Sequence, residues 1–266
     1  MSPRLHHSRD GDPDPAAVEG LERVAFESDP GSAGSDAVAS LRPFGRVFTD
    51  PSIVGDPGRA SADSATLLDQ AEALARLGRR LEAIQTLRLL LARESKAAAP
   101  RLLVAELLAQ GGDLDEAIDQ LTAAAEAVGP TAAILVSRGA LYARSGRSAE
   151  AEQDFREAIR RDATHCPAYR YLGSTLLRRG LTGEAIRVLR EAVAMAPQDA
   201  EASLACGEAL VVAGRYDEAE AILVTAAGLA PNDPRLFLQL GRMFDRQGRI
   251  DEAMAMHRKA REVGTA

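Results

Sequence analysis

The sequence predicts an all-α protein built as a solenoid of stacked helical hairpins. Three columns of mostly small side chains indicate this fold, because each column recurs every 34 residues from Ser64 onward. The first column is Ala71, Ala105, Gly139, Gly173, Gly207 and Gly241. The second is Ala83, Ala117, Ala151, Ala185, Ala219 and Ala253, and the third is Leu90, Ala124, Ala158, Ala192, Ala226 and Ala260. A fixed period of this length is typical of proteins that stack one supersecondary unit several times.

Residues 1–63 precede the repeats and are expected to form a largely disordered or partly structured N-terminal tail. They are rich in Asp, Pro, Gly and Ser, and they carry six arginines against eleven acidic residues. Such a composition buries too little apolar surface to order a chain. The stretch 16–27 has helical apolar spacing after Asp14 and Pro15, which suit a helix start. The stretch 41–54 is a candidate docking segment, for the protein's own groove or for another surface, through Phe44, Val47, Phe48, Ile53 and Val54.

Six repeat units follow and form one predicted domain, 64–266. Their bounds are 64–97, 98–131, 132–165, 166–199, 200–233 and 234–266. Each unit has a helical apolar pattern, then a glycine, then a second helical stretch that opens with acidic residues, which suit the positive end of a helix. The glycines are expected to take the left-handed conformation that ends a helix. They are Gly78, Gly112, Gly146, Gly180, Gly214 and Gly248.

The first column also contains glycines inside helices, where glycine costs about 1 kcal/mol relative to alanine. This cost indicates a structural reason for glycine at that place. We expect neighbouring helix backbones to approach each other closely there.

Bulk composition excludes several classes of protein. The 266 residues carry a net charge of −7, which argues against a nucleic-acid or anionic-membrane binder. No apolar run reaches about 18 residues, so no membrane insertion is expected. Two cysteines are too few for a disulfide framework, and the start of the chain has no secretory signal, so a cytoplasmic protein is expected. Two lysines against 30 arginines indicate a GC-rich bacterial source.

These columns resemble the tetratricopeptide repeat (TPR) family, whose 34-residue pattern has large, small and aromatic residues at fixed places. The unit 166–199 carries the resemblance through Tyr169, Leu172, Gly173, Leu176, Ala185, Leu189, Ala192 and Pro197. The units 64–97 and 98–131 diverge most, because they lack the glycine of the first column and the closing proline. The resemblance covers about three quarters of the chain and implies a right-handed superhelical solenoid.

No pattern in the sequence indicates an enzyme, a cofactor or a metal site. There is no phosphate-binding loop, dinucleotide fingerprint, paired Cys-x-x-Cys or His-Glu-x-x-His. The histidines His6, His7, His165 and His257 are scattered along a rigid stack, which cannot bring them together. Cys206 takes a core position, and nothing near Cys166 indicates an activated nucleophile.

The resemblance implies that a partner binds the concave face, which the first helix of each repeat lines. Carried over onto this chain, the candidate groove residues are Leu68, Glu72, Leu102, Glu106, Val136, Arg144, Arg170, Ser174, Arg178, Leu204, Glu208, Arg235, Leu238, Arg242 and Arg246. They predict an apolar thread with acidic residues early and arginines later, and arginine suits carboxylate or phosphate. Leu68 and Glu72 occupy the places of the carboxylate-clamping residues of chaperone-binding relatives, which disfavours that role.

We therefore expect a scaffold or adaptor that binds a peptide or protein partner, as an assembly factor in a bacterial complex. An alternative is a regulatory or substrate-presenting subunit of a glycosyltransferase or kinase that acts in trans. RNA binding is a third hypothesis, which the negative net charge of the chain disfavours. The last repeat presents Met254, Met256 and Val263, so a homodimer through that repeat is also considered.

Overall fold

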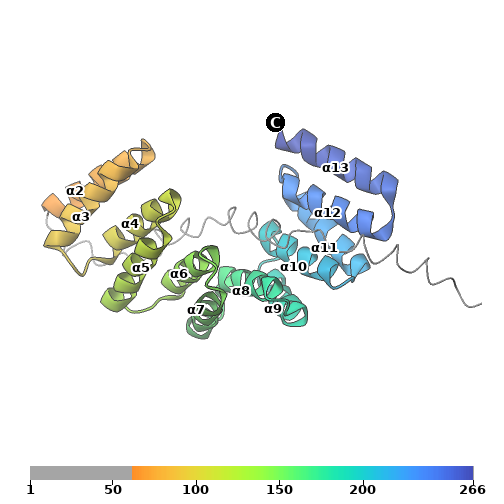
Figure 1. Cartoon of the computed structure of the whole chain (residues 1–266), viewed down its shortest axis with the longest axis horizontal. Coiled ribbons are helices and arrows are strands. Elements are labelled where there is room, and N and C mark those ends of the chain that lie inside the picture. Colours follow the sequence, from red (N-terminus) through yellow and green to blue (C-terminus); the bar gives the residue numbers. More distant parts are fainter. Residues whose placement is uncertain (1–61, 266) are drawn as a thin grey trace, which may run out of the picture. The chain divides into compact units, whose positions relative to one another are not determined.

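The computed structural model describes residues 62–265, and in that range the chain is all α-helical (Figure 1). Twelve helices follow one another as six hairpins. They are α2 (Ala62–Arg76) with α3 (Arg80–Arg93), α4 (Ala98–Gly111) with α5 (Leu114–Val128), α6 (Ala132–Arg144) with α7 (Ser148–Arg161), α8 (Cys166–Arg178) with α9 (Thr182–Met195), α10 (Ala200–Val212) with α11 (Tyr216–Leu229), and α12 (Pro234–Gln247) with α13 (Ile250–Gly264). The predicted fold of stacked hairpins is confirmed.

The first helix begins at Ala62, two residues before the predicted start of the first repeat. The candidate docking segment lies outside the described residues, as does the predicted helix at 16–27. None of the described helices is long and apolar enough to cross a membrane.

Each hairpin turns at a glycine in the left-handed region. The six predicted glycines have φ between +72° and +90°. The residue after each glycine donates its N–H to a carbonyl five residues earlier, as Arg147 does to Tyr142 at 2.8 Å. This bond satisfies a carbonyl that the helix end leaves without a partner. The prediction about these glycines is confirmed.

The interior of each hairpin contains the small columns. Residues of the second and third columns are at most 4% exposed. An added Cβ at Gly173 would lie 2.3 Å from Cγ of Leu189, and one at Gly139 would lie 2.7 Å from Cε1 of Phe155. The first column is therefore small because a large side chain of the second helix fills the space. We expected close backbones at this place, and the structure shows a side chain against a backbone instead.

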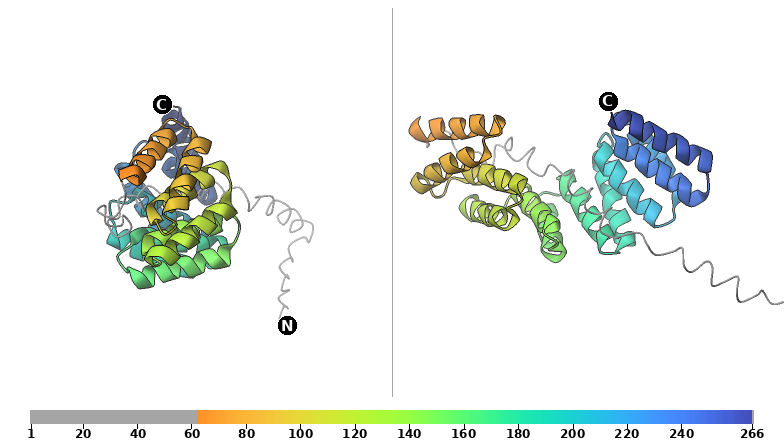
Figure 2. Two further views of the ribbon diagram at one scale, coloured as in Figure 1. Left: turned by 90° about the vertical axis from the view of Figure 1, so that its left-hand side faces the viewer. Right: turned by 45° about the horizontal axis from the view of Figure 1, so that its top comes forward.

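Consecutive hairpins stack in one row. The second helix of each hairpin packs on the first helix of the next, and two views of the row are given in Figure 2. The first helices α6, α8, α10 and α12 also contact one another, whereas no comparable contact joins the second helices within 62–265. The first helices are thus the closer-packed side of the row, which makes them its inner side.

Candidate partner-binding surface

The apolar candidates on the first helices are mostly buried between repeats. Leu102 is 1%, Val136 3% and Leu204 6% exposed, so these side chains hold the stack together. Leu68 in α2 is half-buried, and Leu238 in α12 is 38% exposed. Among these candidates, the apolar side chains that a partner can touch therefore lie toward the ends of the row, and they do not form the thread expected from the sequence.

An arginine–carboxylate ladder joins the last three first helices. Arg170 in α8 donates from Nη1 to Oε2 of Glu201 in α10 at 2.9 Å. Arg235 in α12 donates from Nη2 to Oε1 of the same carboxylate at 2.7 Å. Arg235 also donates to Asp233, whose side chain caps the start of α12. Two of the predicted groove arginines, Arg170 and Arg235, therefore form ion pairs between repeats.

Two further arginines link consecutive first helices through the backbone. Arg144 donates from Nη2 to the carbonyl oxygen of Ala109 at 3.0 Å, and Arg178 donates from Nη1 to that of Ala143 at 3.2 Å. Both acceptors lie in the last turn of the preceding first helix, where carbonyls carry partial negative charge, and the carbonyl of Ala109 also accepts the N–H of Gly112 at 3.3 Å. The contact that the structure shows for both arginines is therefore structural.

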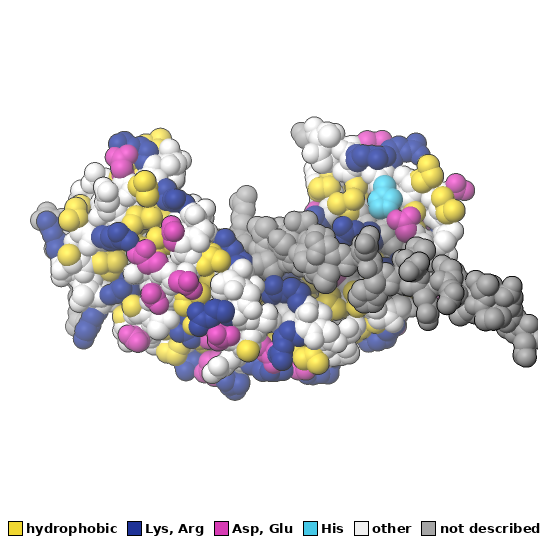
Figure 3. Space-filling model, viewed as in Figure 1, with side chains coloured by type: hydrophobic (Ala, Val, Ile, Leu, Met, Phe, Trp, Pro, Cys, Tyr) yellow, Lys and Arg dark blue, Asp and Glu magenta, His cyan; other side chains and the backbone are white. Residues whose placement is uncertain are grey.

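Arg242 and Arg246 in α12 differ from the other groove arginines. Both are exposed, and neither makes a hydrogen bond or ion pair with any residue of the described range. On the last hairpin, hydrophobic, basic and acidic side chains gather around a histidine (Figure 3), and Nε2 of His257 lies 2.8 Å from Oδ2 of Asp245. The end of the row thus offers positive charge beside the exposed Leu238.

The acidic candidates differ in their surroundings. Burial raises the pKa of Glu208 in α10 to about 7, although the positive charges of Arg242 and Arg235 oppose the shift. Burial also raises the pKa of Glu106 in α4, against a hydrogen bond from Gln110.

Two other polar candidates complete the surface. Glu72 accepts a hydrogen bond from Arg76 at 2.8 Å. Ser174 in α8 is half-buried.

The raised pKa of Glu208 predicts a pH-dependent stability. A carboxyl group with a higher pKa in the folded than in the unfolded chain favours folding while it is protonated. This stabilisation is therefore lost as the pH rises from about 4.5, the ordinary value, through about 7. Replacing Glu208 with glutamine should raise the free energy of unfolding by at least about 1 kcal/mol at pH 8 and leave it nearly unchanged at pH 4. Urea unfolding at both pH values measures this difference, and an equal effect at both would contradict it.

The residues considered for catalysis or metal binding lie apart. No group of three His, Cys, Asp or Glu side chains within 62–265 could hold a metal ion. Nδ1 of His165 lies 3.8 Å from Asp162, and Sγ of Cys166 donates to the carbonyl oxygen of Ala192 at 3.5 Å. Cys206 is buried, which raises the pKa of its thiol and keeps it protonated. His6 and His7 lie outside the described residues.

Sequence reasoning missed Glu201, the carboxylate that two groove arginines share. The signal was present, because Glu201 and Arg235 hold the same place in consecutive repeats. Residues one repeat apart on the inner side are neighbours in a stack, so a pair of opposite charges at that spacing predicts an ion pair.

Comparisons with known proteins agree with this geometry. Two family models described as tetratricopeptide repeat match the chain, one at 176–237 and the other at 68–133, 105–165 and 136–200. A search of curated proteins gave no match.

Three solved structures show the same fold at low identity. PilF of Pseudomonas aeruginosa has a TM-score of 0.63 at 17% identity, over 73% of this chain and 88% of that one. MamA of Desulfovibrio magneticus has a TM-score of 0.56 at 23% identity, over 63% and 95%. YrrB, a TPR protein with an unusual peptide-binding site, has a TM-score of 0.51 at 22% identity, over 66% and 91%. The repeat columns, the hairpin geometry and the matching family models show that the chain belongs to the tetratricopeptide repeat family.

Proposed function

We propose that the chain is a protein-interaction scaffold or adaptor whose first helices bind a segment of another protein. In this proposal it acts in the bacterial cytoplasm as an assembly factor for a multiprotein complex. Membership of the TPR family supports the proposal, and so does the similar fold of YrrB, which has a peptide-binding site. The observation that carries it is the pair of exposed arginines, Arg242 and Arg246, which make no hydrogen bond or close ion pair with residues 62–265, although Arg242 acts electrostatically on Glu208.

The chemistry of this end of the row defines the segment that fits. Arginine forms charge-assisted hydrogen bonds to carboxylates, and Leu238 beside the pair offers an apolar contact. The neighbouring Glu208 has a pKa of about 7, so its negative charge is about half developed at pH 7 and falls away at lower pH. A segment with acidic residues next to an apolar side chain therefore suits α12, whereas a basic segment does not.

Reversing both charges tests this site. We expect Arg242→Glu with Arg246→Glu to weaken partner capture at least about tenfold, because two charge-assisted hydrogen bonds of about 1.5–3 kcal/mol each are lost. The measurement is quantitative affinity capture from native cells with the full chain as bait. The matched control is Arg93→Glu with Lys96→Glu in the first hairpin, which reverses two exposed charges outside the groove. Equal capture by the wild-type protein and the groove variant would contradict the proposed site.

A further inference from the structure

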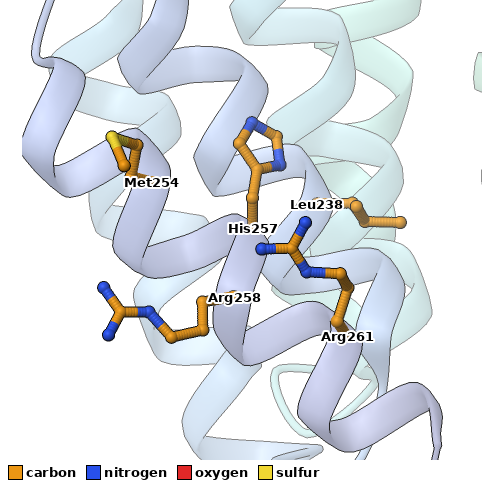
Figure 4. Close-up of a pocket in the computed structure, with 5 residues that line it drawn as sticks. All are labelled: Leu238, Met254, His257, Arg258 and Arg261. Atoms are coloured by element: carbon orange, nitrogen blue, oxygen red, sulfur yellow. The ribbon is translucent and has the colours of Figure 1, made fainter.

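A second surface lies on the last hairpin, where it shares Leu238 with the predicted groove and continues onto α13. It is an open pocket of about 660 Å³ lined by Leu238 of α12 and by Met254, His257, Arg258 and Arg261 of α13. Figure 4 shows the guanidinium of Arg261 beside His257 and Leu238, whereas Arg258 extends to the opposite side of α13. Leu238 is 38% and Met254 59% exposed. The pocket therefore combines apolar surface with two positive charges.

The repeat register shows what shape fits the pocket. Leu204 lies one repeat before Leu238 and is 6% exposed, and Ile186 lies two repeats before Met254 and is 5% exposed. In the inner hairpins the next first helix covers these places, as α12 packs on α10 and α11. The pocket is thus the surface on which one more helix would lie, and no residue of 62–265 covers it.

The same register shows what charge the occupant carries. The arginines two, three and five repeats before Arg258 each contact a glutamate in the second helix of the next hairpin. These pairs are Arg88 with Glu116, Arg156 with Glu184 at 2.8 Å, and Arg190 with Glu218. Arg258 holds their place but makes no ion pair with the described residues, so its exposed guanidinium is open to a carboxylate of a bound segment.

Arg261 strengthens this conclusion. At the place of Arg261, the three preceding hairpins have apolar residues that pack against the core. These residues are Ala227, Val193 and Ile159. Arg261 also makes no side-chain hydrogen bond or ion pair with residues 62–265. A purely apolar helix would leave this charge desolvated without a partner, which costs free energy.

A second copy of the chain fits the pocket poorly. To continue the stack, the first hairpin of the second copy would have to pack on α12 and α13 as α12 packs on the hairpin before it. At the places of the buried Leu236 and Leu240 of α12, that first hairpin has Thr66 and Gln70. Both end hairpins are also net positive, with six basic against four acidic residues in 64–97 and seven against four in 234–265. End-to-end contact between copies is therefore unfavourable in both packing and charge.

We propose that the pocket of α12 and α13 binds an acidic amphipathic helix of a partner protein. The apolar face of this helix covers Leu238 and Met254, and its carboxylates pair with Arg258 and Arg261. The site extends beyond the proposed groove, because four of its five lining residues belong to α13 and lie outside the first helices.

Two synthetic peptides test the proposal on the full chain. Both are alanine-rich helices of about 18 residues, long enough to be partly helical alone, with leucines along one face. One has glutamates beside the leucines and the other has glutamines at the same places. By isothermal titration calorimetry at low salt, we expect the glutamate peptide to bind at least about tenfold more tightly than the glutamine peptide.

Charge reversal locates the binding. The double variant Arg258→Glu with Arg261→Glu, called the α13 variant, should bind the glutamate peptide at least about tenfold more weakly than the wild-type protein. It should prefer a third peptide that has lysines at the places of the glutamates. The double variant Arg242→Glu with Arg246→Glu, called the α12 variant, should keep most of the affinity for the glutamate peptide. The control Arg93→Glu with Lys96→Glu should keep it as well. Because both residues are exposed, the unfolding midpoint of the α13 variant should match that of the wild-type protein.

Four outcomes would overturn the proposal. One is equal affinity for the glutamate and glutamine peptides, or no binding of either at about 1 mM. Another is loss of binding in the α12 variant with full binding in the α13 variant, which would place the peptide in the groove. A dimer of the full chain that the α13 variant abolishes would assign the pocket to a second copy. Displacement of the glutamate peptide by a peptide of residues 41–54 would assign it to the protein's own segment.

Discussion

Replacing Phe155 with alanine is expected to lower the free energy of unfolding by about 3–5 kcal/mol. The side chain is fully buried, and its ring stacks on Tyr171 with 5.5 Å between centroids. It also fills the space over Gly139, where an added Cβ would lie 2.7 Å away. The substitution therefore removes contacts within one hairpin and to the next hairpin. It also leaves a cavity beside Gly139, which has no side chain to fill the space.

Urea unfolding followed by circular dichroism measures this loss. The matched control is Gln153→Ala, because Gln153 is exposed on the same helix and its change should stay within about 0.5 kcal/mol. In an array whose repeats contact only their neighbours, hydrogen exchange should accelerate first in α6, α7 and α8. Similar unfolding free energies for the two variants would contradict the central packing role of Phe155.

Replacing Gly173 with alanine is expected to lower the free energy of unfolding by about 1–3 kcal/mol. Alanine is the better helix former by about 1 kcal/mol, so propensity alone predicts stabilisation. The new Cβ, however, would lie 2.3 Å from Cγ of Leu189. This atom is a branch point close to the backbone, so it cannot swing away as the end of a flexible side chain can. Overpacking therefore outweighs propensity at this place.

Gly228 in α11 provides the matched control. An added Cβ there would meet nothing within 4 Å. Gly228→Ala should therefore stabilise the protein by up to about 1 kcal/mol, the opposite sign. In the background of Leu189→Ala, the cost of Gly173→Ala should shrink, because the space is then free. The same sign for Gly173→Ala and Gly228→Ala would contradict this explanation of the glycine column.

The fold was predictable because its determinants are local and repeated six times. A glycine with positive φ at Gly146, for example, needs only the geometry of its own hairpin. The reason for Gly173 was only partly predictable: its small size indicates a close contact, but the contacting residue, Leu189, follows from how the two helices face each other.

The candidate surface was less predictable because its groups act across repeats. The family pattern predicts which helix carries Arg144 and which carries Arg178. It does not predict that each arginine donates to a backbone carbonyl, because that contact depends on how the hairpins stack. The exposure of Leu238 and the burial of Leu204, at the same place in consecutive units, depend on whether another helix covers them. Equal places in a repeat therefore do not have equal environments.

The links from Arg144 to Ala109 and from Arg178 to Ala143 have a mechanical consequence. Each link spans one repeat on the inner side, so spreading the first helices apart lengthens it before the apolar contacts between hairpins separate. Bringing those helices closer leaves the links intact. The two hydrogen bonds therefore oppose an opening of the inner side of the array.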